Sequence, residues 1–379
     1  MHPWLAQRTD LFDSSGIRKM FDLAAKMKDP INLSIGQPDF PVPDRVKRAA
    51  AAAIDSDHNG YSSTQGIAPL LEAIQARVDA ELGQGDRRVL ITSGTSGALV
   101  LAMLTLVDPG DEVICFDPYF VMYPALTGMV GGKIVPVDTY PDGPGGRFRI
   151  DPARVAAAIT PRTKLILLNS PANPTGVMAS EAEVRAVAEL AAGHNIVLIS
   201  DEIYREFCYD GPLISPTRWN DQTIVIDGFS KSHGVTGWRL GWVHGPSAVL
   251  EKMTMLQQYT FVCAPHPLQW AAVQALGVGM EAEVDAYRGR RDRLVAGLLE
   301  CGYELTAPAG AYYVFPRVPN GYASGSEFVA RAIEHELLII PGKVFSGRDT
   351  HFRVSFAASE ATIDRGLEVL RRLADQPPA

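Results

Sequence analysis

The chain has few cysteines and no long run of hydrophobic residues. Its four cysteines, in 379 residues, are scattered and form no CxxC pair, which argues against a disulfide framework and against a cysteine-based metal site. The longest helix-like apolar run, residues 98–107, is half of the roughly 20 residues that a membrane-spanning helix needs. The first residues also lack the basic and then apolar pattern of a secretory signal peptide. We therefore expect a cytoplasmic protein with reduced thiols, no metal and no membrane partner.

An excess of positive charge is also missing. The chain carries 35 basic and 43 acidic residues, a formal net charge of −8. Because proteins that bind a phosphate backbone need a basic surface, we expect no nucleic-acid partner, although a local basic cluster could still bind one small anion. The hydrophobic fraction of 46% and the charged fraction of 21% are typical of a globular enzyme.

Seven short apolar segments alternate with longer helical patterns. They are rich in Val, Ile and Leu with little polar alternation, which is typical of strands covered on both faces. They span residues 87–92, 111–116, 133–137, 163–169, 195–200, 223–228 and 239–244. The repeated strand–helix–strand order predicts an α/β fold, with a mostly parallel seven-stranded sheet between helices. Ligands of such sheets bind beyond the carboxyl ends of the strands.

The pattern changes after about residue 245 to long helices. Weaker strands follow near residues 311–316 and 351–357, and a last helix starts from Ser359. This predicts a second, smaller α+β domain. We expect a large ligand-binding domain over residues 41–280, a small C-terminal domain over residues 281–379, and an N-terminal segment of residues 1–40 that packs with the small domain.

Small polar residues follow the first predicted strand, at a turn into a helix. In Ser93-Gly94-Thr95-Ser96, backbone N–H groups and hydroxyls can converge on one anion, aided by the positive end of the helix. The spacing is neither that of a Walker A loop nor that of the GxGxxG dinucleotide signature. The turn indicates a phosphate site, with a plain tight turn as the alternative.

Three other predicted strands are followed by residues with chemical potential. Asn173 lies in "SPANPTG" (170–176), Asp201 and Tyr204 follow the next strand, and Lys231 follows residues 223–228. An aspartate at the end of a buried strand is costly unless it is paired or hydrogen-bonded, and a helix cap is its plainer interpretation. A lysine beside an apolar strand end is desolvated, which lowers its pKa and leaves a nucleophilic amine, whereas the plainer interpretation is a surface loop.

An amine, a buried carboxylate, an anion cradle and an extra arginine are together what pyridoxal phosphate requires. Lys231 would form the Schiff base, and Asp201 would keep the pyridinium nitrogen protonated. Asn173 and Tyr204 would hydrogen-bond the phenolic oxygen, and Phe120 would stack on the ring. The phosphate would be held by Ser93, Gly94, Thr95, Ser96, Ser230 and Arg239.

Three motifs follow one another along the chain: "NSPANPTG", "SDEIY" and "SKSHGVTGWRLGW". They resemble the NxPxNPTG, D-x-x-Y and SKxxxxxGWRxG motifs of the fold-type I pyridoxal-phosphate aminotransferases of class I/II, the aspartate and aromatic aminotransferase superfamily. The resemblance extends over residues 33–356. It implies a homodimer with each active site at the interface, in which Tyr61 reaches the phosphate of the neighbouring subunit.

By the same resemblance, Arg353 would grip the α-carboxylate of the substrate through a two-pronged pair, with a surface arginine at a strand edge as the alternative. Gly36 and Asn173 would also lie against the substrate. Phe120 stands where many relatives have a tryptophan or tyrosine. No residue matches the second arginine that dicarboxylate specialists use, so the preference for aspartate or glutamate stays open.

The resemblance implies an aminotransferase that moves an amino group between an L-amino acid and a 2-oxo acid by a ping-pong mechanism. Lys231 would be both the covalent anchor and the general acid–base, assisted by Asp201 and Tyr204. A C–S β-lyase on the same fold is the first alternative, because it would use the same cofactor contacts. A non-catalytic regulator and a plain anion-binding protein are two others.

Overall fold

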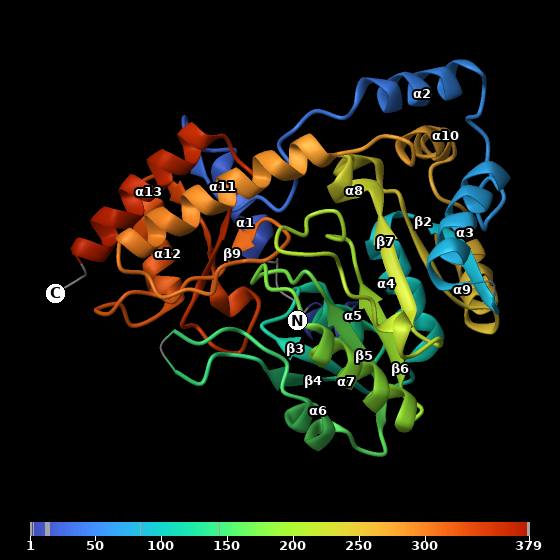
Figure 1. The fold of residues 1–379 in the computed structure, drawn as a ribbon, viewed down its shortest axis with the longest axis horizontal. Coiled ribbons are helices and arrows are strands. Elements are labelled where there is room, and N and C mark those ends of the chain that lie inside the picture. The colour runs from blue at the N-terminus through green and yellow to red at the C-terminus, as the bar shows by residue number, and fades with distance from the viewer. Residues whose placement is uncertain (1, 3, 12–15, 84, 144, 377–379) are drawn as a thin grey trace.

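A seven-stranded sheet forms the centre of the structure, a computed structural model that describes residues 2, 4–11, 16–83, 85–143 and 145–376 (Figure 1). Its strands are β2 (Arg87–Thr92), β3 (Glu112–Asp117), β4 (Lys133–Asp138), β5 (Thr163–Asn169), β6 (Val197–Asp201), β7 (Ile224–Gly228) and β8 (Gly241–Pro246). Their order is β2-β8-β7-β6-β5-β3-β4. Within this sheet β8 is antiparallel to both of its neighbours, and the other pairs are parallel. The predicted α/β class with a mostly parallel seven-stranded sheet is confirmed.

Two of the seven predicted strands, 87–92 and 163–169, have the observed bounds, and the other five differ by one or two residues at an end. The clearest case is the last strand, predicted from residue 239 and observed from Gly241. A 3-10 turn, η3 (Thr236–Trp238), precedes it, and Arg239 has a left-handed backbone with φ of 53°. A residue in that conformation cannot continue an extended strand, so β8 starts after it.

Successive residues of the central strands enter different hydrophobic cores. In β5, Leu165 and Leu167 pack with one set of helices, whereas Ile166 and Leu168 pack with another. This alternation explains the unbroken apolar segments, because both faces of the sheet are covered. One face lies under α4 (Gly94–Leu106), α5 (Met122–Met129) and α9 (Ser247–Thr260). The other lies under α6 (Pro152–Ala158) and α7 (Glu181–Gly193), and beside β2 under α2 (Asp44–Asp55), α3 (Ala68–Leu82) and α10 (His266–Ala275).

The C-terminal helices form a separate group, at the end of the molecule opposite to α2, α3 and α10 (Figure 1). They are α11 (Glu281–Glu300), α12 (Gly325–Glu334) and α13 (Glu360–Asp375). A small antiparallel sheet, β11-β12-β9, packs with them and consists of Ile340–Pro341, Phe352–Ser355 and Tyr313–Val314. The weaker strands and the last helix that the sequence predicts are therefore present.

Part of the N-terminal segment joins this C-terminal group. β1 (Ile31–Asn32) pairs in parallel with β10 (Leu337–Leu338), and Leu33 is fully buried in the same core. Residues 1, 3 and 12–15 of the segment lie outside the described residues, and the bounds of the three domains stay predictions. The remaining elements are α1 (Gly16–Ala24), α8 (Phe229–Ser232), η1 (Gln7–Leu11), η2 (Pro216–Arg218) and η4 (Gly342–Val344). Across the described ranges, no helix has the length and apolar character to cross a bilayer.

The buried face of β6 gives a stability prediction. Leu198 is 1% exposed and packs against α7, so Leu198→Ala leaves a cavity and should lower the free energy of unfolding by about 2–5 kcal/mol. Leu299→Ala is the control, because Leu299 on α11 is 55% exposed and its loss should change that free energy by less than about 0.5 kcal/mol. Urea unfolding followed by circular dichroism measures both values. Equal losses for the two variants would contradict the described packing.

Candidate active site

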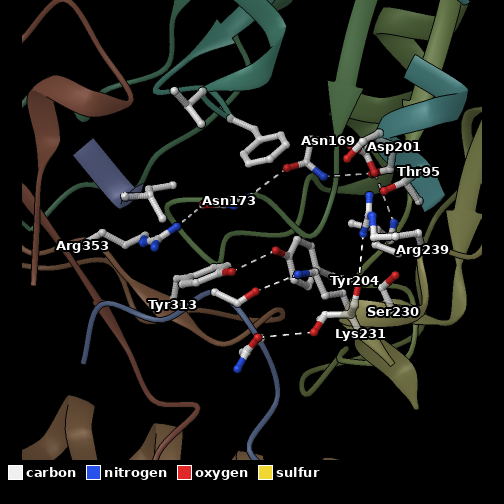
Figure 2. A pocket seen from close by; sticks show the side chains of 18 residues that line it. Thr95, Asn169, Asn173, Asp201, Tyr204, Ser230, Lys231, Arg239, Tyr313 and Arg353 are labelled. Carbon is white, nitrogen blue, oxygen red and sulfur yellow. Dashed lines mark hydrogen bonds between the residues drawn. The ribbon is translucent and has the colours of Figure 1, made fainter. Parts of the chain in front are cut away.

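A cavity of about 300 Å³ lies beyond the carboxyl ends of the parallel strands, between the sheet and the C-terminal group (Figure 2). Residues predicted from sequence line much of it: Gly36, Thr95, Ser96, Phe120, Asn173, Asp201, Tyr204, Ser230, Lys231, Arg239 and Arg353. Ser93 and Gly94 come just before this lining, at the start of α4. The predicted site residues therefore converge from β2, β5, β6 and β7 at one edge of the sheet and from β12 opposite.

Lys231 extends from the short helix α8, directly after β7. Its Nζ donates a hydrogen bond of 2.7 Å to the carbonyl oxygen of Gly36. The pKa of Lys231 is lowered to about 8, mainly by burial and also by repulsion from Arg353 and Arg239, while the negative charge of Asp201 opposes the shift. The amine is therefore neutral in a much larger fraction of molecules near neutral pH than an ordinary lysine is.

Asp201 is the last residue of β6 and is 4% exposed. Its Oδ2 accepts a hydrogen bond of 2.8 Å from Tyr123 Oη, and its Oδ1 accepts one of 3.3 Å from the backbone N–H of Ile203. Burial raises the pKa of Asp201 to about 6, against the opposing effect of these two hydrogen bonds. The carboxylate is thus mainly ionised at neutral pH. A helix cap would need only the bond to a backbone N–H, whereas Asp201 also accepts a hydrogen bond from the side chain of Tyr123.

Small polar residues and Arg239 meet at the start of α4, on the same side of the cavity as Asp201 and Lys231 (Figure 2). Ser93 stands at the N-cap position of α4, but its side chain makes no hydrogen bond to the helix. The first backbone N–H groups of α4 are therefore not used by a Ser93 cap. Gly94 has φ of 72°, and a Cβ at this position would lie 2.7 Å from Arg239 Nη2. Glycine therefore lets the guanidinium approach the start of the helix. Ser230 Oγ is buried and has no hydrogen-bond partner in the part of the chain that the structure describes.

Arg353 lies on β12 and is 1% exposed, so the surface-arginine interpretation is wrong. Its Nη1 donates to Asn173 Oδ1 at 2.9 Å, and its Nη2 donates to the carbonyl oxygen of Ser34 at 2.8 Å. The guanidinium lies between two rings, 4.4 Å from the centroid of Tyr313 and 4.8 Å from that of Phe345. Its Nε is buried without a partner among the described residues.

Three functional candidates were not predicted from sequence. Asn169, the last residue of β5, accepts from the backbone N–H of Asn173 at 2.9 Å and donates to the carbonyl oxygen of Asp201 at 2.9 Å. Asn169 is the first residue of "NSPANPTG" and follows an apolar segment, so the sequence did contain a signal that it lies at the site. Tyr123 and Tyr313 had no local signal, because each meets its partner only through the fold.

Tyr61 lies outside the cavity. Its side chain is 83% exposed, and it belongs to the loop that contains Gly60, whose carbonyl oxygen is 2.9 Å from His266 Nδ1. The sequence-based interpretation assigns Tyr61 to the site of a neighbouring subunit. That assignment stays a prediction.

Comparison with known proteins gives consistent results over nearly the whole chain. The family model described as "Aminotransferase class I and II" matches residues 28–370. The chain is 36% identical to the putative aminotransferase YugH of Bacillus subtilis, over 98% of both chains, and 35% identical to a probable aspartate aminotransferase of Methanocaldococcus jannaschii, over 97% and 99%. It is also similar to the solved structure of the aspartate aminotransferase from Thermus thermophilus with maleate, with a TM-score of 0.92 and 34% identity over 97% and 99% of the two chains.

The surroundings of Lys231 predict an unusual titration. Only the neutral amine reacts in reductive methylation. In cofactor-free protein, the methylation rate of Lys231 should therefore rise about tenfold per pH unit and level off above pH 8. The rate at surface lysines should keep rising up to about pH 10.4. Mass spectrometry of peptides labelled at several pH values measures the profile. Asp201→Asn removes the negative charge that opposes the effect, so it should move the plateau to lower pH. A Lys231 profile equal to that of the surface lysines would disprove the described environment.

Proposed function

Since this chain belongs to the class I and II aminotransferase family, we propose that it moves an amino group between an L-amino acid and a 2-oxo acid by a ping-pong mechanism through Lys231. The observation that carries this proposal is the placement of a buried amine with a lowered pKa and a buried carboxylate, Asp201, on one cavity. An amine that is partly neutral can attack a carbonyl group and later move a proton.

The residues of the cavity fit pyridoxal phosphate. Two features suit a phosphate group at the positive end of α4: the hydroxyl of Ser230 has no partner among the described residues, and Gly94 lets the Arg239 guanidinium approach the helix start. When bound, this cofactor supplies an aldehyde that takes up the amino group and a ring that accepts electrons from the substrate. The phosphate would be held by Ser93, Gly94, Thr95, Ser96, Ser230 and Arg239. Lys231 would hold the aldehyde as a Schiff base.

The ring of the cofactor would be fixed at three points. The ionised carboxylate of Asp201 would hold a proton at the ring nitrogen. Asn173 Oδ1 already accepts from Arg353, which leaves its Nδ2 group as a donor, and this group would donate to the phenolic oxygen together with Tyr204 Oη. Phe120 lines the cavity and would pack against the ring face.

Arg353 would bind the α-carboxylate of the substrate. Its two hydrogen bonds to the protein use only some of the five N–H donors of a guanidinium, and they fix its plane. A planar, fixed guanidinium can form the two parallel bonds that a carboxylate prefers. Gly36 would lie against the substrate, and its lack of a side chain supports this, because a Cβ there would lie 2.9 Å from Tyr313 Oη.

Lys231 would also move the proton during the reaction. With a pKa of about 8, its Nζ can take a proton from the substrate Cα and return it to the cofactor carbon near neutral pH. Each amino acid would leave its amino group on the enzyme before the second substrate binds, which gives ping-pong kinetics.

We also propose a cytoplasmic homodimer, and an exposed face near the cavity supports the dimer. Tyr61 and Tyr259 are each 83% exposed, and Gln257 Nε2 joins their two segments by donating to the carbonyl oxygen of Thr64 at 2.6 Å. The same face continues to Phe261, which packs against the first turns of α4. A second copy on this face would lie beside the proposed phosphate site. The free thiols suit a reducing compartment.

The central test replaces the proposed anchor. Lys231→Ala should lower transamination by at least about a thousandfold, because the variant loses both the covalent attachment and the proton-transfer group. Borohydride treatment of the wild-type holoenzyme should fix the cofactor on the peptide that contains Lys231, as measured by mass spectrometry. Lys164→Ala, at an exposed position on β5, is the control and should keep wild-type activity.

Three outcomes would decide against the proposal. Wild-type turnover by Lys231→Ala, or borohydride labelling of another lysine, would remove the assigned role. Release of pyruvate from a β-substituted amino acid without an oxo-acid acceptor, in the absence of transamination, would instead indicate the C–S β-lyase.

Tyr61 provides a test of the dimer. If its hydroxyl reaches the phosphate in the neighbouring subunit, Tyr61→Phe should raise the dissociation constant of the cofactor roughly tenfold or more while the dimer persists. Absorbance titration of cofactor-depleted protein and sedimentation velocity measure the two properties. Tyr259→Phe, equally exposed, should leave the cofactor affinity unchanged. A monomer that binds the cofactor tightly would overturn the assignment.

A further inference from the structure

We propose that Tyr313 is a positioning residue that acts on both ends of the reaction site: its hydroxyl directs Tyr204, and its ring holds Arg353. This inference rests on the proposed function, in which Tyr204 contacts the cofactor and Arg353 binds the substrate. Figure 2 shows Tyr313 between these two side chains. Tyr313 is 1% exposed and lines the cavity.

The hydroxyl groups of Tyr313 and Tyr204 form a direct pair. Their oxygens are 3.0 Å apart, and the ring centroids are 5.8 Å apart with nearly perpendicular planes. A phenol has a single O–H donor, so Tyr204 can donate to the cofactor only if Tyr313 supplies the proton between the two oxygens. A hydroxyl that accepts one hydrogen bond donates a stronger second one. Tyr313 therefore sets the direction and the strength of the Tyr204 hydrogen bond.

The ring of Tyr313 acts on Arg353. The guanidinium carbon lies 4.4 Å from the ring centroid, and Phe345 covers the guanidinium at 4.8 Å. Cation–π contacts of this kind are strongest where water is excluded, as around this arginine, which is 1% exposed. The two rings restrict the guanidinium plane and so preserve the geometry that a carboxylate needs.

The backbone fixes Tyr313 relative to both partners. Tyr313 pairs with Ser355 across β9 and β12, so it lies on the strand next to Arg353. Its carbonyl oxygen packs against Gly176, where a Cβ would approach within 2.4 Å. Gly176 ends the "NSPANPTG" motif that carries Asn173, so a movement of Tyr313 would disturb the turn that presents Asn173.

The two roles of Tyr313 predict separable effects. A hydrogen bond to the phenolic oxygen of the cofactor stabilises negative charge there and favours the deprotonated form of the bound chromophore. In Tyr313→Phe that bond is weaker, so the pH midpoint of the absorbance change of the holoenzyme should rise by roughly half to one pH unit. The ring remains, so KM for the amino donor should stay near the wild-type value. In Tyr313→Leu the hydroxyl and the ring are both lost, so the pH midpoint should rise and KM for the amino donor should also rise, roughly three- to thirtyfold.

A double-mutant cycle with Tyr204→Phe tests the pathway. Tyr204→Phe should itself raise the midpoint, and adding Tyr313→Phe should then change it no further, because the hydroxyl acts through Tyr204. Tyr303→Phe is the control for losing a buried tyrosine hydrogen bond: its hydroxyl donates to the carbonyl oxygen of Leu370 at 2.9 Å, in the core away from the cavity. This variant should lose stability in urea without a change of midpoint.

The outcomes separate this inference from the proposed function. If borohydride fixes the cofactor on Lys231 of the wild type but Tyr313→Phe keeps the wild-type midpoint, the inference is wrong and the proposed function stands. A shift of equal size in the Tyr204→Phe background, or in Tyr303→Phe, would also overturn it. If the wild type carries no chromophore on Lys231, the proposed function fails first.

Discussion

The site depends on keeping the amine of Lys231 out of water. Burial is the largest cause of its lowered pKa, and the nearby arginines add to the effect. A buried amine needs a hydrogen-bond partner, and the structure provides one in the carbonyl oxygen of Gly36. Gly36 comes from the N-terminal segment, Lys231 from the end of β7 and Asp201 from the end of β6. The environment of the amine therefore exists only when the sheet and the segment around Gly36 are both in place.

The two halves of the cavity have different structural origins. The sheet supplies groups at the carboxyl ends of parallel strands, where Asn169, Asp201 and Gly228 end β5, β6 and β7. The C-terminal group supplies Tyr313 and Arg353 from paired strands. The hydrogen bond from Arg353 to Asn173 joins the halves, so the group that would bind the substrate is coupled to one that would bind the cofactor.

Local patterns in the sequence predicted the sheet and the sheet side of the cavity. Buried parallel strands are unbroken apolar segments, and the residues just after them, such as Asn173, Asp201 and Lys231, fall at one edge by geometry alone. No comparable geometric rule predicts where the chain after residue 245 places its side chains. Arg353 was found only by resemblance, and Tyr123 and Tyr313 were missed, because a tyrosine in a hydrophobic segment looks like any core residue until its hydroxyl partner is known. The exact start of β8 was missed because a left-handed arginine has no sequence signature.

The balance of charge in the cavity explains why it suits anions in an acidic protein. Its lining contains three cations, Lys231, Arg239 and Arg353, against the carboxylate of Asp201. With a net charge of −8 for the chain, this excess of positive charge is a local feature of the site. Arg353 and Arg239 lower the pKa of Lys231 by repulsion, although burial is the larger cause, and burial also lowers the pKa of Arg353. A phosphate beside Arg239 and a carboxylate beside Arg353 would relieve that repulsion, so each ligand favours the arrangement that the other requires.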